Sequence, residues 1–128
     1  MKKILIVDDD RPLAEILDRF LITLGYPKAT FAHDGGEGLL FLKENPEVVL
    51  VLTDLEMPNV NGVQFIEQSR LKVGYRGKII LMSGTIAPDD DLVECAQTHN
   101  VDAVLSKPFL PHKVLDALTI AGVNPNMF

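Results

Sequence analysis

The sequence has no tryptophan, only one cysteine and no long apolar run. Because Cys95 has no second cysteine to pair with, an internal disulfide is excluded, and a reducing compartment such as the cytoplasm is favoured. The first apolar stretch, residues 4–7, ends at three aspartates. It is too short for the core of a signal peptide, which needs roughly 7–15 apolar residues. No run approaches the roughly 18 apolar residues of a membrane helix, so we expect a cytoplasmic protein without membrane contact.

Clustered positive charge is also lacking. The 12 basic residues are scattered along the chain against 18 acidic ones, which gives a net charge of −6. Nucleic-acid phosphates are bound by clustered Lys and Arg, so we expect no direct nucleic-acid binding. A metal cation or a cationic partner surface fits this charge better. At 128 residues and 47% apolar content, the chain suits one domain with one core.

Five short apolar runs alternate with segments of helical periodicity. The runs are residues 4–7, 29–32, 48–53, 78–82 and 103–105. This (βα)5 alternation predicts an α/β fold with a doubly wound, parallel five-stranded sheet and right-handed crossovers. The second and fifth runs are the weakest and suit edge strands. The expected strand order is therefore 2-1-3-4-5, the flavodoxin-like arrangement.

Helix signals lie between and after these runs. Pro12 suits the first turn of one helix and Gly25 its C-terminal end, while Asp34 suits the N-cap of a second helix that ends near Asn45. Further helices are expected over residues 62–73 and 89–99 and from about Pro111 onward. The last should carry these apolar side chains on one face: Val114, Leu115, Leu118 and Ala121. We expect the domain to span residues 1–122, with 123–128 a C-terminal tail or the stub of a linker.

The polar residues that follow the strands are chemically coherent. Residues 8–10 are all aspartate, Asp54 follows the third run, Ser83 the fourth and Lys107 the fifth. The carboxyl ends of parallel strands meet at one edge of the sheet, where ligands bind. Several carboxylates in one crevice repel each other unless a hard cation joins them, so we expect Mg²⁺, or Mn²⁺ in its place.

A lysine and a hydroxyl aimed at the same crevice indicate phosphoryl transfer. The cation and Lys107 would neutralise charge on the phosphoryl oxygens, and Ser83 would donate a hydrogen bond to one of them. One carboxylate remains as the nucleophile and would form an aspartyl phosphate. Asp54 is the better candidate because it is a lone acid at the end of a buried central strand, whereas residues 8–10 are a cluster suited to holding metal.

Over nearly its whole length the chain resembles the receiver domain of two-component response regulators. The landmarks of this resemblance, in order along the chain, are Asp8-Asp9, Asp54 followed by Met57-Pro58 and Gly62, Ser83-Gly84, and Lys107-Pro108-Phe109. The resemblance implies that Asp54 accepts a phosphoryl group from a histidine kinase or a histidine phosphotransfer protein. Such a domain is not a conventional enzyme, but it catalyses its own phosphorylation and dephosphorylation.

The resemblance also implies the ligand set. Mg²⁺ would be bound by Asp9, Asp54 and the backbone carbonyl of Glu56, and Asp8 would help through water. Ser83 and Lys107 would hold the phosphoryl oxygens, and the Lys107–Pro108 bond would be cis. Phosphorylation would switch the region between the fourth strand and fourth helix, and with it the face made by the fourth helix, fifth strand and fifth helix. Receiver domains also form homodimers through that face.

One position departs from the family pattern. Val104 stands three residues before Lys107, where the family usually has a tyrosine or phenylalanine that swings inward on activation. The departure leaves phosphorylation itself unaffected and puts the usual coupling in doubt. Glu56 and Thr85 occupy positions that in the family influence how fast the acyl phosphate hydrolyses, so we expect the acid at Glu56 to alter its lifetime, in a direction that the sequence leaves open.

The sequence leaves three alternative functions. A haloacid-dehalogenase-type phosphohydrolase would use Asp8 and Asp10 as a D-x-D motif, but Arg11-Pro12 replaces the residues expected after it and Asp54 would have no role. A flavodoxin-like FMN carrier needs a phosphate loop where this chain has three acids. A receiver fold that is never phosphorylated is the third alternative. The complete set of strand-end residues argues against it, and Val104 keeps it open.

Overall fold

The computed structural model describes residues 1–57, 59–84 and 90–128, without the side chains of residues 90–93. The strands are β1 (Lys3–Val7), β2 (Thr30–Ala32), β3 (Val48–Asp54), β4 (Lys78–Ser83) and β5 (Ala103–Ser106). The α-helices are α1 (Arg11–Thr23), α2 (Gly35–Glu44), α3 (Gly62–Gln68), α4 (Asp90–Thr98) and α5 (Pro111–Ile120). A π-helix, η1 (Ser69–Val73), continues α3, and a 3₁₀-helix, η2 (Pro125–Met127), lies near the C-terminus.

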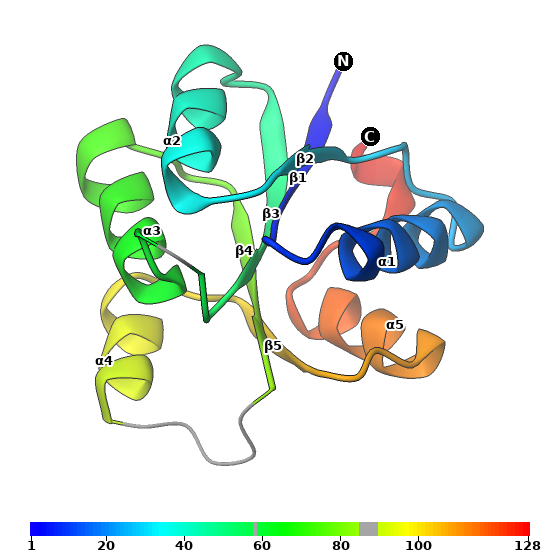
Figure 1. The fold of residues 1–128 in the computed structure, drawn as a ribbon. Coiled ribbons are helices and arrows are strands. Elements are labelled where there is room, and N and C mark those ends of the chain that lie inside the picture. Colours follow the sequence, from blue (N-terminus) through cyan, green and yellow to red (C-terminus); the bar gives the residue numbers. More distant parts are fainter. Residues whose placement is uncertain (58, 85–89) are drawn as a thin grey trace.

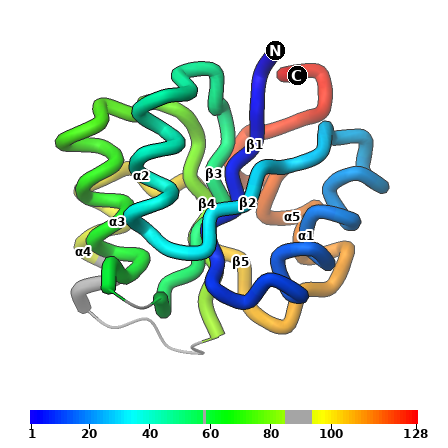
Figure 2. Tube along the Cα trace, turned by 45° about the horizontal axis from the view of Figure 1, so that its top comes forward, coloured from blue at the N-terminus to red at the C-terminus, as the bar shows by residue number. Residues whose placement is uncertain are grey.

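The strands form one parallel sheet in the order β2-β1-β3-β4-β5, so the predicted flavodoxin-like topology is confirmed. Helices α1 and α5 cover one face of the sheet, and α2, α3 and α4 cover the other (Figure 1). The turned view keeps the same two layers, with the two termini near each other (Figure 2). The carboxyl ends of β1, β3, β4 and β5 therefore point to one edge of the molecule.

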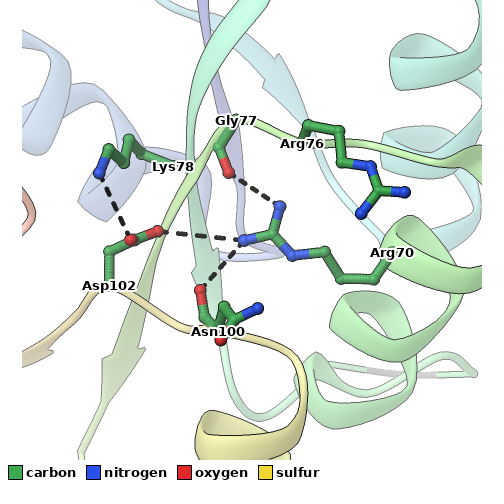
Figure 3. A pocket seen from close by; sticks show the side chains of 6 residues that line it. All are labelled: Arg70, Arg76, Gly77, Lys78, Asn100 and Asp102. Carbon is green, nitrogen blue, oxygen red and sulfur yellow. Dashed lines mark hydrogen bonds and ion pairs between the residues drawn. The ribbon is translucent and has the colours of Figure 1, made fainter.

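Two of the predicted helix-end residues, Asp34 and Gly25, lie where the structure places the ends of helices. Asp34 accepts a hydrogen bond from the Glu37 backbone N–H at 2.7 Å and caps α2, as expected. Gly25 follows α1 with a φ of 98°, the left-handed conformation that glycine adopts without strain. The helix expected over residues 62–73 is present, but its last five residues are π-helical, and this segment directs Arg70 toward the start of β4 (Figure 3). The predicted start of the next helix, Asp89, lies outside the described residues.

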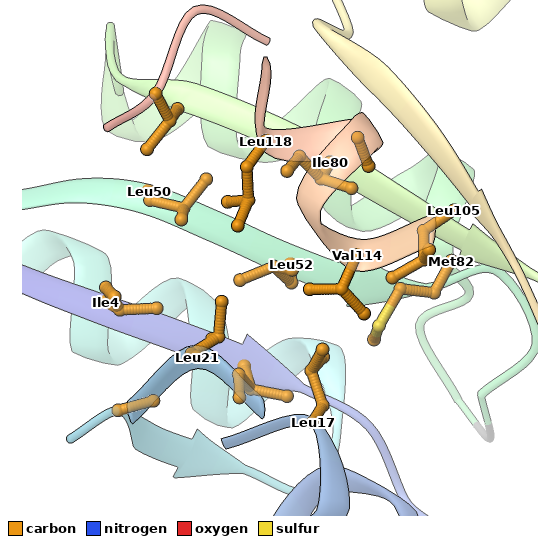
Figure 4. Close-up of a cluster of buried hydrophobic side chains, with 14 of the residues drawn as sticks. Ile4, Leu17, Leu21, Leu50, Leu52, Ile80, Met82, Leu105, Val114 and Leu118 are labelled. Carbon is orange, nitrogen blue, oxygen red and sulfur yellow. The ribbon is translucent and has the colours of Figure 1, made fainter. Parts of the chain in front are cut away.

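The core lies in two layers because successive strand residues point to opposite faces of the sheet. On one face, Leu50, Leu52 and Ile80 pack against α1 and α5 (Figure 4). On the other face, Leu5, Val51 and Leu81 pack against α3, with Phe65 and Ile66 fully buried. The two layers explain why the three central strands read as unbroken apolar runs.

The predicted apolar face of the last helix is wrong in one residue. Val114, Leu118 and Ala121 are buried, but Leu115 is 48% exposed, and Ala117 takes the buried place instead. Residue 115 follows 114 by about 100° around the helix, so it turns away from the layer that Val114 and Leu118 share. Sequence alone could not separate the two, since both are apolar.

Three of the six residues after 122 pack against the core: Val123, Met127 and Phe128. Val123 is buried, and the Tyr26 hydroxyl donates to its carbonyl at 3.2 Å. The rings of Tyr26 and Phe128 meet edge to face with their centroids 5.7 Å apart. A domain boundary at residue 122 stays a prediction. Among the described residues, none of the helices combines the length and apolar character needed to cross a bilayer.

Candidate functional site

Three carboxylates converge at the carboxyl edge of the sheet. Asp8 and Asp9 directly follow β1, and Asp54 is the last residue of β3, the neighbouring strand. One carboxylate oxygen from each lies within 4.8 Å of the others. Asp9 is exposed, whereas Asp8 and Asp54 are buried. The structure thus brings together the three side chains that the sequence placed at adjacent strand ends.

Asp8 carries the clearest electrostatic consequence of this arrangement. Asp8 is only 3% exposed, and the backbone N–H of Asp10 donates to its Oδ1 at 2.9 Å. Burial, reinforced by the nearby charge of Asp54, raises the pKa of Asp8 to about 6, although the Asp10 N–H and Lys107 act in the opposite direction. Keeping this carboxyl ionised at neutral pH therefore costs free energy, and a bound cation would offset that cost.

Lys107 is the positive group of the site. Its Nζ lies 3.1 Å from Oδ2 of Asp54 and 3.5 Å from Oδ2 of Asp8. Burial alone would lower the pKa of Lys107, but the two carboxylates outweigh burial and raise it, so the ammonium stays charged. The Lys107–Pro108 peptide bond is cis, as the resemblance implied.

Ser83 lies at the adjoining strand end. It is the last residue of β4, pairs in register with Ser106 and is buried. Its carbonyl accepts a hydrogen bond from the backbone N–H of Lys107 at 2.8 Å. Ser83 and Lys107 are therefore held side by side by the β4–β5 pairing, on the same edge as Asp54.

The loop after Asp54 is shaped by a close backbone approach. The backbone N–H of Glu56 lies 3.4 Å from Oδ1 of Asp54, and the Glu56 side chain is exposed. The Gly62 N–H donates to the Leu55 carbonyl at 2.8 Å. A Cβ at Gly62 would collide with the carbonyl oxygen of Asp54 and lie 2.7 Å from Cα of Leu55. Only glycine fits there, and this packing fixes the backbone on which Asp54 and Glu56 sit.

Sequence reasoning missed one local role. Asp10, read there as part of the acidic cluster, accepts a hydrogen bond from the Leu13 backbone N–H at 3.1 Å and caps α1. The signal was available, because an aspartate two residues before Pro12 is a common helix start. Thr85 and Pro58 of the family pattern lie outside the described residues.

Val104 is an outward-facing residue of β5. It is 53% exposed, in a strand whose residues alternate between buried and exposed. The valine side chain, smaller than the aromatic ring usual in the family, thus occupies a surface position on the strand beside Ser83 and Lys107.

The donor set of the cluster fits a hard divalent cation. All of its ligand atoms are carboxylate oxygens, and two of the three acids are buried. Mg²⁺ prefers oxygen ligands and usually keeps several of its waters. The cluster is open to solvent at Asp9, so such waters can be kept there. The fit rests on this chemistry and on the raised pKa of Asp8.

A cavity of about 170 Å³ lies at the opposite end of β4 and β5. Three of its six lining residues are cationic, and the full lining is Arg70, Arg76, Gly77, Lys78, Asn100 and Asp102. Two of the three cations are already engaged, since Lys78 lies 3.7 Å from Asp102 and Arg70 donates to several carbonyls. We assign no ligand to this cavity.

Comparison with known proteins gives a consistent result. Residues 4–119 match the model of the response regulator receiver domain. The chain is 33% identical over 116 residues to a probable chemotaxis protein CheY of Rhizobium etli, covering 91% of this chain and 88% of that protein. It is also 32% identical over 107 residues to the chemotaxis protein CheY-3 of Vibrio cholerae, with 84% and 81% covered. The solved structure of CheY4 from Vibrio cholerae superposes with a TM-score of 0.80 at 25% identity, covering 93% of this chain and 97% of that one.

Proposed function

Because the chain belongs to the family of response regulator receiver domains, we propose that Asp54 is its phosphoacceptor and that Mg²⁺ assists the transfer. One observation carries the proposal: the Lys107 ammonium lies 3.1 Å from Asp54, at the point where three carboxylates converge. A carboxylate beside a fixed cation is arranged to attack phosphorus and to have the added charge neutralised.

The proposed reaction is an in-line displacement. An oxygen of Asp54 attacks the phosphorus of a phosphohistidine, the P–O bond forms, and the P–N bond breaks with its electron pair going to the imidazole. Lys107 neutralises one phosphoryl oxygen, and Ser83 donates a hydrogen bond to another. Such positioning and charge stabilisation is most of what a protein supplies in phosphoryl transfer.

The metal ligands in this proposal are Asp9, Asp54 and the Glu56 carbonyl, with Asp8 acting through water. When bound, the divalent ion supplies the positive charge that offsets repulsion between these carboxylates and the incoming phosphoryl group. The buried position of Asp8, whose pKa is already raised, supports this assignment. Glu56 is exposed beside the site, which supports a role in setting the lifetime of the acyl phosphate.

Receiver domains interact with histidine kinases or histidine phosphotransfer proteins. We propose one of these as the phosphodonor here, in the cytoplasm, where the free Cys95 stays reduced. The proposed output is a change in the β4–α4 region that alters the α4-β5-α5 face, which would also form a homodimer interface. Val104 is exposed on that face in place of an aromatic ring, so the readout relies on other groups.

Incubation with acetyl phosphate and Mg²⁺, followed by intact mass measurement, tests the proposal. Wild type should gain the mass of one phosphoryl group, and Asp54→Asn should gain none. The control is Asp116→Asn, which also removes one negative charge but lies on the exposed side of α5, outside the site. It should gain one phosphoryl group, as wild type does. An adduct that persists in Asp54→Asn would refute the assignment. Turnover that depends on Asp8 instead would indicate a haloacid-dehalogenase-type phosphohydrolase.

A further inference from the structure

Arg70 is a heavily engaged charged side chain outside the acidic site, with four hydrogen bonds to backbone carbonyls. Its Nε donates to the His99 carbonyl at 2.9 Å, and its Nη2 donates to the Asn100 carbonyl at 3.1 Å. Its Nη1 donates to the carbonyls of Tyr75 and Gly77 at 2.9 and 2.8 Å. The side chain is only 14% exposed, and Figure 3 shows its guanidinium between Gly77 and Asn100. One planar cation thus joins two separate backbone segments.

The two segments are the end of α4 and the start of β4. His99 and Asn100 directly follow α4, where the negative end of the helix dipole favours a cation. Tyr75 and Gly77 belong to the connection from η1 to β4. Arg70 therefore binds the turn that directly follows α4 and ties this turn to the start of β4.

The geometry of Arg70 depends on the π-helix that carries it. Helix α3 widens into η1 at Ser69, whose hydroxyl donates to the Ile66 carbonyl at 2.8 Å. The segment ends at Gly74, which has a φ of 77°. Single π turns inside helices are frequent at functional sites because they redirect a side chain. Here the side chain so redirected is Arg70, and none of the proposed phosphorylation chemistry uses it.

The opposite end of α4 is the end that follows Ser83 in the sequence. Residues 84–89 connect Ser83 to the start of α4. The helix has nine residues, so its two ends are about 13 Å apart at 1.5 Å per residue. If the C-terminal end is held, a rotation of about 10° moves the N-terminal end by about 2 Å over that length.

We propose that Arg70 is the fixed pivot of α4, so that phosphorylation rotates the helix about its C-terminal end instead of shifting it as a whole. This inference rests on the proposed function. It gives the domain a readout that needs no inward-swinging ring at Val104. A displacement of the N-terminal end of α4 would then decrease along the helix toward Arg70, and it would be largest in the first turn of α4.

Two-dimensional NMR of ¹⁵N-labelled protein, with and without acetyl phosphate and Mg²⁺, tests the pivot. In wild type, phosphorylation should shift the amide signals of residues 90–94 and leave those of residues 99–102 nearly unchanged. In Arg70→Lys, the shifts should extend through residues 99–102, because one ammonium cannot reach both backbone segments as the guanidinium fork does. Amide exchange at the end of α4 should also become roughly tenfold faster in this variant, since several charge-assisted hydrogen bonds are lost.

Tyr75→Phe is the matched control. It removes the hydrogen bond from the Tyr75 hydroxyl to the Lys78 carbonyl, in the same region, and leaves the Arg70 contacts in place. It should retain the wild-type pattern of shifts. Equal shifts at both ends of α4 in wild type would overturn the pivot, whether or not Arg70→Lys folds, and so would an unchanged pattern in a folded Arg70→Lys. Intact mass is recorded on each sample: a missing adduct on wild type overturns the proposed function and the pivot with it, whereas an adduct with uniform shifts overturns the pivot alone.

Discussion

Replacing Asp8 with asparagine should stabilise the metal-free protein at neutral pH. The Asp8 side chain is fully buried and its pKa is raised from 3.8 to about 6, chiefly by burial. A rise of about two pKa units corresponds to about 3 kcal/mol of preference for the protonated form. Asparagine is neutral and keeps an oxygen for the Asp10 N–H, although it weakens the contact with Lys107. We expect a net gain of about 1–3 kcal/mol in the free energy of unfolding at pH 7.

The pH dependence has a definite sign. A carboxyl whose pKa is raised in the folded state binds its proton more tightly there than in the unfolded chain. The contribution of Asp8 to stability is therefore fully present below its unfolded pKa of 3.8 and is lost as the pH rises through about 6. Asp8→Asn lacks this titration, so the advantage of the variant should be near zero at pH 4 and should develop between pH 4 and pH 7.

Urea unfolding in EDTA at pH 4, 5.5 and 7 measures these differences. Thermal unfolding gives a second readout, with roughly 3–5 °C expected per kcal/mol for a chain of this size. Asp116→Asn is the control for net charge, because it removes one negative charge from an exposed position on α5. Added Mg²⁺ should stabilise wild type by mass action and Asp8→Asn much less. A variant no more stable than wild type at pH 7, or equally favoured at pH 4, would refute the electrostatic reasoning.

Two further substitutions test the packing around the site and the core, each with a matched control. Gly62→Ala should lower the free energy of unfolding by about 1–3 kcal/mol, because its Cβ would meet the Asp54 and Leu55 backbone. Gly84→Ala, whose added Cβ meets no atom of the described residues within 4 Å, should cost far less, and equal losses in urea unfolding would contradict the close approach. Leu118→Ala should cost about 2–5 kcal/mol by leaving a cavity. Leu115→Ala on the same helix should stay within about 1 kcal/mol of wild type, and a cost like that of Leu118→Ala would mean that Leu115 is buried.

Much of the architecture was predictable because it depends on local patterns. Buried parallel strands require continuous apolar runs, and such runs at residues 4–7, 48–53 and 78–82 became β1, β3 and β4. Asp34 and Gly25 mark helix ends by their own hydrogen bonding and conformational freedom. The edge positions of β2 and β5 followed from the weakness of their runs.

The prediction was less complete where exposure depends on a residue's neighbours. Both Leu115 and Leu118 are leucines on one helix, yet only the second meets the sheet. Asp10 was grouped with Asp8 by sequence adjacency, but it points to the start of α1 and caps it. In each case, the direction in which the side chain points, rather than the residue type, determined what the side chain contacts.

The sequence by itself determined which chemical groups stand at the ends of the strands. It therefore also determined that one edge of the sheet carries Asp8, Asp9, Asp54, Ser83 and Lys107. Parallel strands impose this, because their carboxyl ends all face the same way. Only the tertiary structure decided how those groups act on one another. The 3.1 Å between Lys107 and Asp54 and the raised pKa of Asp8 depend on packing between segments distant in sequence. The same holds for Arg70, whose carbonyl partners lie between 5 and 30 residues away along the chain.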